Sequence, residues 1–240
     1  MPLHRAALSQ HRFGGYLTIM QWNLPNILTV LRLLAAPGVA VAFLFFGRPL
    51  ADWFALILFI SAAVTDWFDG YLARSWKQES KFGAMLDPIA DKAMVIIALL
   101  VIVGYSSMSP WLVLPATFIV FREVFVSGLR EFLGHEAKLL SVTKLAKWKT
   151  TAQMVAIAVL FSQDIFLWHM LGLTQGMDGP TVDGIMSGAI SDEVGILWLA
   201  QLRDIAGTIG LTLLWIAAAL TLITGWDYFR KALPFLRDSA

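Results

Sequence analysis

The chain has 240 residues, of which 58% are hydrophobic, and its formal net charge is only +1. So much apolar sequence excludes an ordinary soluble domain of this length and predicts one integral membrane domain. The absence of cysteine excludes a disulfide, a thiol nucleophile and a cysteine-ligated metal.

The first 22 residues mix basic and imidazole side chains with large apolar ones. His4, Arg5, His11 and Arg12 are interspersed with leucine, phenylalanine and tryptophan. This mixture predicts an amphipathic helix that lies on the membrane surface. A signal peptide is a poorer interpretation, because the apolar run that follows is long and lacks an evident small-residue cleavage site. We therefore expect a juxtamembrane segment over 1–22.

Six apolar stretches are long enough to cross a membrane as helices. They lie at about 26–46, 51–73, 83–103, 111–133, 148–168 and 204–226. The expected fold is therefore an all-α integral membrane protein: an N-terminal amphipathic surface helix, a domain of six transmembrane helices over 23–231, and a tail at 232–240. The Gly- and Asp-rich stretch 172–195 is expected to be a long, solvated loop. Arg32 lies two turns inside the first span, where it either pairs with an anion or carboxylate or extends to the membrane surface.

Basic residues gather on one side of the expected bundle. Six spans place both termini on the same side, and most lysines and arginines outside the spans fall there. The opposite side has only Arg48 and Arg203. Because cytoplasmic loops of membrane proteins are enriched in positive charge, we expect both termini to be cytoplasmic.

Two pairs of aspartates lie at the same side. Asp66 and Asp69 are three residues apart near the end of the second span, and Asp87 and Asp91 are four apart in the third. Each spacing places both side chains on one helix face. Four acids that converge in membrane-type sequence would repel one another unless cations lay among them, so we expect two divalent cations held by oxygen ligands. The alternative is two pairs of solvated acids at helix ends.

The four aspartates suit a metal ion, and the basic residues on the same side of the membrane suit a phosphate. Together they point to phosphoryl transfer on an amphiphilic substrate. A divalent-cation transporter is a competing class, because intramembrane carboxylates also mark ion pathways. A transporter would need acids across the membrane or on both halves of a repeat, whereas all four aspartates lie near one face.

The pattern Asp66-x-x-Asp69-Gly70-x-x-Ala73-Arg74, followed by Gly83-x-x-x-Asp87-x-x-x-Asp91, resembles the signature of the CDP-alcohol phosphotransferase family at every position. The resemblance implies a binuclear Mg²⁺ or Mn²⁺ site on the four aspartates. It also implies that Asp87 and Asp91 are catalytic, with Asp91 as the base that deprotonates the acceptor hydroxyl. The implied nucleotide-binding residues are Asn26, Thr29, Asp66, Asp69, Gly70, Ala73, Arg74 and Gly83.

Two further stretches resemble those members of the family that use sn-glycerol 3-phosphate as the acceptor. One covers 23–32, and the other covers 122–133 together with Lys-Trp-Lys-Thr-Thr-Ala-Gln at 147–153. The resemblance implies that the acceptor phosphate is bound by Arg122, Arg130, Lys147 and Lys149, which suit a phosphate as forked and point charges. For the two lysines, anionic lipid head groups are an alternative. Glu123 can pair with Arg122 or Arg130 of the same span, or with another helix.

The implied reaction transfers a phosphatidyl group from CDP-diacylglycerol to sn-glycerol 3-phosphate and releases CMP. Inositol phosphate, serine and phosphatidylglycerol are alternative acceptors, although an uncharged acceptor such as serine would not require four cations. The resemblance also implies a homodimer in a bacterial-type inner membrane, in contact with membrane lipids and with its active site on the cytoplasmic side. No nucleic-acid partner is expected.

Overall fold

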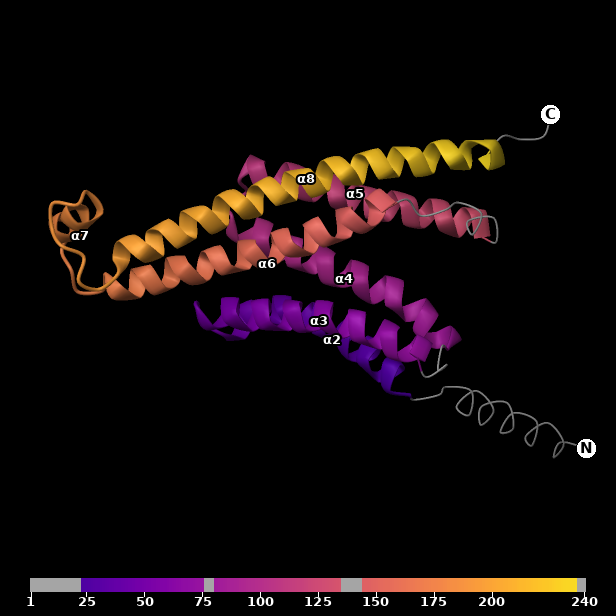
Figure 1. Ribbon diagram of the computed structural model, residues 1–240, viewed down its shortest axis with the longest axis horizontal. Coiled ribbons are helices and arrows are strands. Elements are labelled where there is room, and N and C mark those ends of the chain that lie inside the picture. Colours follow the sequence, from indigo (N-terminus) through magenta and orange to yellow (C-terminus); the bar gives the residue numbers. More distant parts are fainter. Residues whose placement is uncertain (1–22, 76–79, 135–143, 237–240) are drawn as a thin grey trace, which may run out of the picture.

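A computed structural model describes residues 23–75, 80–134 and 144–236, with only the backbone at 67, 69–74 and 144–147. All regular structure in these ranges is helical (Figure 1). The helices are α2 (Leu24–Phe45), α3 (Leu50–Ser75), α4 (Lys81–Tyr105), α5 (Pro110–Leu133), α6 (Lys144–Leu173), α7 (Gly179–Met186) and α8 (Ile196–Leu236). The expected all-α fold is confirmed, whereas the expected surface helix at 1–22 lies outside the described residues.

Four of the helices are long and apolar enough to cross a membrane. They are α2, α5, the Trp148–Leu173 part of α6, and α8. Large apolar side chains such as Leu44, Phe121 and Leu100 are exposed on the outside of the bundle, as expected for surfaces that face lipid. The chain is therefore a multi-pass membrane protein, and the count of six spans stays a prediction.

The helices form two groups that share one core. α6 and α8 run side by side along most of the molecule, with α5 packed on α8 (Figure 1). α2 packs on both α3 and α4, and α3 and α4 join this group to α6. Small buried residues such as Ala36, Ala55, Ala98 and Ala217 occupy the core between the groups. Small side chains let helix backbones approach closely, which brings the polar residues of α2, α3 and α4 together.

Short polar residues begin two of the helices beside the acidic pairs. Asn23 Oδ1 accepts a hydrogen bond from Asn26 N at 3.0 Å and begins α2, and Ser80 Oγ accepts one from Gly83 N at 2.9 Å and begins α4. Both bonds satisfy backbone donors that have no partner within the first turn. The start of α2, the end of α3 and the start of α4 lie at one end of the molecule, together with the ends of α5 and α8 (Figure 1).

An ion-pair cluster joins the helices at the opposite end. Arg48, in the turn between α2 and α3, contacts Asp52 Oδ1 and Asp164 Oδ2, each at 2.5 Å. Its guanidinium also lies over the ring of Tyr105, 4.9 Å from the centroid. Burial alone would lower the pKa of Arg48, but the hydrogen bonds and charges of the two carboxylates outweigh it and raise the pKa above the ordinary value. The cluster therefore ties α3 to α6 as a charged unit.

The stretch 172–195 is not the uninterrupted loop that its composition predicts. α6 continues to Leu173, α7 lies within the stretch, and α8 follows at once. Asp178 Oδ1 accepts a hydrogen bond from Thr181 N and begins α7, while Asp192 accepts three from backbone N–H groups at 195–197 and begins α8. The prediction of a loop is correct for 174–178 and 187–195 but was wrong for 179–186, where Asp178 caps a short helix.

α8 is also longer than the span expected at 204–226. Its 41 residues correspond to roughly 60 Å, about twice the thickness of the hydrocarbon layer. The predicted span begins only after Arg203, at Asp204 or Ile205, yet the helix already includes both charged residues, whose side chains are 40% and 74% exposed. A change in hydropathy predicts where a helix leaves the hydrocarbon, not where the helix itself ends.

Candidate active site

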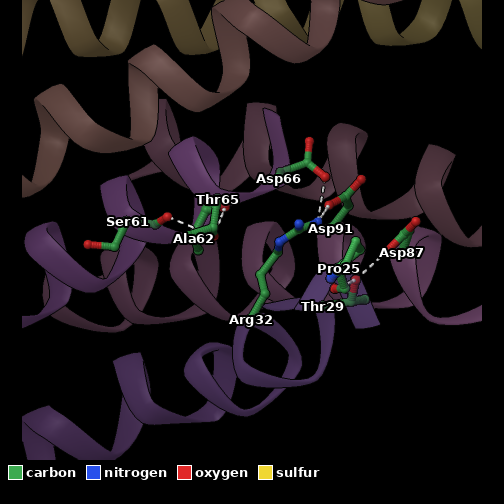
Figure 2. A network of polar contacts seen from close by, with 9 residues as sticks. All are labelled: Pro25, Thr29, Arg32, Ser61, Ala62, Thr65, Asp66, Asp87 and Asp91. Atoms are coloured by element: carbon green, nitrogen blue, oxygen red, sulfur yellow. Dashed lines mark hydrogen bonds and ion pairs between the residues drawn. The ribbon is translucent and has the colours of Figure 1, made fainter. Parts of the chain in front are cut away.

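Two aspartates from different helices share one arginine. Arg32 Nη1 donates to Asp66 Oδ1 on α3 at 2.5 Å and to Asp91 Oδ1 on α4 at 3.0 Å (Figure 2). The Arg32 side chain is 2% exposed, whereas those of Asp66 and Asp91 are 48% and 53% exposed. Of the two interpretations of Arg32, pairing with carboxylates is therefore correct. Both carboxylates therefore contact the same buried guanidinium, while about half of each aspartate side chain remains exposed.

Thr29 and Asn26 extend this polar surface along α2. Thr29 Oγ1 donates to Asp87 Oδ1 at 2.8 Å (Figure 2). One turn earlier, Asn26 Oδ1 accepts a hydrogen bond from Ser80 Oγ at 2.7 Å. A Cβ added at Gly83 would lie 2.8 Å from Asn26 Oδ1. Thus α2 and the first two turns of α4 bring together three of the residues predicted to bind the nucleotide.

The remaining residues of the aspartate pattern lie in the last turns of α3. Asp69, Gly70, Ala73 and Arg74 are helical, and their side chains lie outside the described part of the structure. Their predicted roles in metal and nucleotide binding stay predictions.

The donor set suits a hard divalent cation. Within the side chains that the structure describes, no three acids or histidines are close enough together to enclose a metal ion. The three described aspartates nevertheless offer only oxygen ligands, and two of them already share a positively charged group while half exposed. Mg²⁺ and Mn²⁺ prefer such carboxylate oxygens. The three described aspartates, Asp66, Asp87 and Asp91, therefore fit such an ion, while Asp69 stays a predicted fourth ligand.

A second charged cluster joins α5 and α6. Glu123 on α5 accepts hydrogen bonds from Lys149 Nζ on α6 and, at 3.1 Å, from Arg122 Nη1. Glu123 and Lys149 are 8% and 6% exposed. Both interpretations of Glu123 are therefore correct, because it pairs with the neighbouring cation Arg122 and, through Lys149, with another helix. Two of the cations predicted to bind the acceptor phosphate therefore meet at one buried carboxylate.

Lys92 belongs to the same cluster and was missed by the sequence interpretation. Lys92 Nζ donates to Ser127 Oγ at 2.5 Å, and Ser127 Oγ donates to the backbone carbonyl of Glu123. A lysine inside an apolar run is a sequence signal of a functional residue. Lys92 directly follows Asp91, the last residue of the aspartate pattern, and was assigned no role of its own. We call Lys92, Arg122, Glu123, Ser127 and Lys149 the acceptor cluster.

The other two predicted phosphate-binding cations are not placed in this cluster. Arg130 is exposed two turns beyond Arg122 on α5, and the described residues include no ion pair with it. The side chain of Lys147 lies outside the described part.

An apolar groove opens beside Arg122. It has a volume of about 270 Å³, lies between α5 and α8, and is lined by aromatic residues that include Phe121, Phe125 and Trp226. The groove places apolar surface next to the guanidinium of Arg122. An amphiphilic phosphate requires this combination of apolar surface and positive charge.

Comparison with known proteins agrees with these features. Residues 22–176 match the profile of the CDP-alcohol phosphatidyltransferase family. A CDP-diacylglycerol–glycerol-3-phosphate 3-phosphatidyltransferase from Cereibacter sphaeroides is 68% identical over 220 residues, which cover 91% of this chain and 99% of that protein. Proteins of the same name from Rickettsia bellii and Haemophilus influenzae are 38% and 43% identical, covering 87% and 59% of this chain and 94% and 76% of their own lengths. The chain belongs to the CDP-alcohol phosphatidyltransferase family.

Proposed function

We propose that this chain is a metal-dependent enzyme of anionic phospholipid biosynthesis. It transfers the phosphatidyl group of CDP-diacylglycerol to sn-glycerol 3-phosphate, giving phosphatidylglycerophosphate and CMP. The observation that carries this proposal is the 68% identity over 99% of the Cereibacter sphaeroides relative, whose name states the donor and the acceptor. The other acceptors, inositol phosphate, serine and phosphatidylglycerol, have no such relative among those above. Family membership also argues against the divalent-cation transporter.

In this reaction Asp91 accepts the proton of the primary hydroxyl of glycerol 3-phosphate. The hydroxyl oxygen forms a bond to the phosphorus that bears diacylglycerol, the bond from that phosphorus to the CMP oxygen breaks, and CMP leaves with the electron pair. Divalent cations bound to the four aspartates would neutralise the pyrophosphate charge. Arg32 supports this role of Asp91, because it contacts both Asp91 and Asp66 and orients their carboxylates.

The substrates occupy two neighbouring regions in this proposal. The cytidine nucleotide lies along α2, the end of α3 and the start of α4, where Asn26, Thr29 and Gly83 are close together. The acceptor phosphate is bound by Arg122 and Lys149, with Arg130 and Lys147 as the other predicted contacts. Lys92 supports the closeness of the two regions. It directly follows Asp91 on α4, and its Nζ donates a hydrogen bond to Ser127 on α5.

The membrane arrangement follows from the helix lengths and the charge distribution. α3 and α4, with 26 and 25 residues, are each about 38 Å long and complete six spans with α2, α5, α6 and α8. The excess of basic residues on one side supports an orientation with the active site and both termini on the cytoplasmic side of the membrane. Because the chain lacks cysteine, single cysteines at Lys81 and Ser106 should react with an impermeant thiol reagent from opposite sides. The homodimer is proposed on family resemblance alone.

The reaction can be tested by CMP release from purified protein in detergent. With CDP-diacylglycerol and Mg²⁺, CMP release should depend on added glycerol 3-phosphate and stop when EDTA removes the metal. Parallel reactions with inositol phosphate, serine and phosphatidylglycerol should release CMP only at the rate without an acceptor. Release that depends on one of these compounds instead would keep the family and reject the acceptor.

Gly83→Ala is expected to weaken binding of the cytidine nucleotide. Its new methyl group would lie 2.8 Å from Asn26 Oδ1 and 3.3 Å from Ser80 Oγ, so these side chains must move. We expect a higher KM for CDP-diacylglycerol and a loss of about 1–3 kcal/mol in stability, as for other overpacked sites. Gly104→Ala, in the same helix with no atom within 4 Å, is the matched control. Equal KM values in the two variants would place Gly83 outside the nucleotide site.

A further inference from the structure

A carboxylate lies at the centre of the cations that are proposed to bind the acceptor phosphate. Glu123 accepts hydrogen bonds from Arg122 and Lys149, and its backbone carbonyl accepts one from Ser127, which in turn holds Lys92. A carboxylate has the wrong charge to bind a phosphate. Its presence at this point therefore has to be explained by what it does to the cations.

The cations cannot hold this arrangement by themselves. They come from α4, α5 and α6, and like charges that converge inside a helix bundle repel one another strongly where water is scarce. The Lys149 side chain is only 7% exposed, so it has little water to replace a lost partner. A buried charge without a counter-charge is costly, and a flexible lysine would turn away toward solvent. One carboxylate among them offsets this repulsion.

We propose that Glu123 is a positioning residue of the acceptor site. Its carboxylate orients Arg122 and Lys149 toward one point, and Ser127, one turn along α5, fixes Lys92 beside them. The site then binds the phosphate group of a small polyol phosphate next to Asp91, while Glu123 itself does not touch the acceptor. This role rests on the proposed function of Arg122 and Lys149 in binding that phosphate.

The kinetics of Glu123→Gln test this role. The amide keeps the size of the side chain and removes its charge. We expect KM for glycerol 3-phosphate to rise roughly tenfold to a hundredfold, as when one partner of a buried charge pair is lost. KM for CDP-diacylglycerol should stay unchanged. If Glu123 merely competed with the phosphate, its removal would lower KM for glycerol 3-phosphate; a lower or unchanged value overturns the proposal. Glu131→Gln, an exposed acid on the same helix, is the matched control and should behave as wild type.

A double-mutant cycle separates positioning from a general structural effect. Lys149→Met should raise KM for glycerol 3-phosphate, and adding Glu123→Gln to it should raise KM much less than in the wild-type background. Full additivity would mean that Glu123 does not act through Lys149, which overturns the proposal. An unchanged KM in Lys149→Met alone would instead remove Lys149 from the acceptor site, a failure of the proposed function.

The conservative variant Glu123→Asp keeps the charge on a shorter side chain. Its KM for glycerol 3-phosphate should lie between those of wild type and Glu123→Gln, because a carboxylate can still reach one of the two cations. If Glu123→Gln is not recovered as a folded protein, this variant serves alone. A wild-type KM in Glu123→Asp under those conditions would contradict the positioning role, since the shorter side chain cannot hold both partners at the distances observed.

Discussion

Asp91→Asn is expected to abolish phosphatidyl transfer in a protein that still folds. An amide does not accept the proton of the acceptor hydroxyl, and loss of general-base catalysis alone costs roughly a hundredfold to ten-thousandfold in rate. The same change removes one negative ligand from the proposed metal site, which should add to the loss. CMP release with saturating CDP-diacylglycerol and glycerol 3-phosphate would measure the effect.

Folding should survive this substitution because Asp91 is not the sole partner of a buried charge. Its side chain is 53% exposed, and Arg32 keeps its 2.5 Å contact with Asp66. Asp204→Asn makes the same chemical change at an exposed position of α8 and should leave the rate unaltered. Substantial residual turnover in Asp91→Asn, at a wild-type melting temperature, would take Asp91 out of the role of base.

Arg32→Met is expected to lower activity more than tenfold and to make the stability of the protein depend on divalent cations. Arg32 supplies the positive charge between Asp66 and Asp91. Without it the two carboxylates repel each other and lose their common orientation. We expect a loss of about 1.5–3 kcal/mol in EDTA, the range for hydrogen bonds to charged groups. This loss is smaller than for a fully buried pair because both carboxylates are half exposed.

Thermal unfolding in detergent tests this dependence without relying on activity. Mg²⁺ should recover a larger part of the melting temperature in Arg32→Met than in wild type, because a bound ion replaces the lost positive charge between the carboxylates. Arg203→Met, at an exposed position of α8, is the control for loss of a cation. An equal Mg²⁺ response in Arg32→Met and wild type would show that Arg32 and the metal do not share these carboxylates.

In both clusters, like charges from different helices are paired with one residue of opposite charge. At the nucleotide side, acids from α3 and α4 are held by a cation from α2; at the acceptor side, cations from α5 and α6 are held by an acid. Four of the groups that are proposed to meet an oppositely charged ligand, Asp66, Asp91, Arg122 and Lys149, therefore already have an internal counter-charge. This arrangement lowers the cost of burying the charges in a membrane protein. For this reason Arg32 and Glu123, and not only the proposed ligand-binding residues, are expected to be sensitive to substitution.

Much of the fold and the site could be predicted from the sequence because those features depend on local spacing. The pairs Asp66/Asp69 and Asp87/Asp91 lie on single helix faces whatever the helices pack against. Apolar runs predicted where the long helices lie, although not where each of them begins and ends. The pattern from Asp66 to Asp91 is specific enough to predict the family that the comparisons confirm. The resemblance also implied that Lys149 and Arg122 act together, and the structure brings the two side chains to one carboxylate, Glu123.

Other features depended on which helix faces meet, and only the tertiary structure decided them. The sequence left two partners open for Arg32 and for Glu123, it gave no sign that Lys92 reaches α5, and it grouped Arg130 with Arg122 although Arg130 is exposed. The extent of α8 was underestimated for a related reason, since charged residues can lie within a helix once it leaves the hydrocarbon. Spacing along one helix is a local property with a period of 3.6 residues, whereas a contact between two helices depends on the packing of the whole bundle.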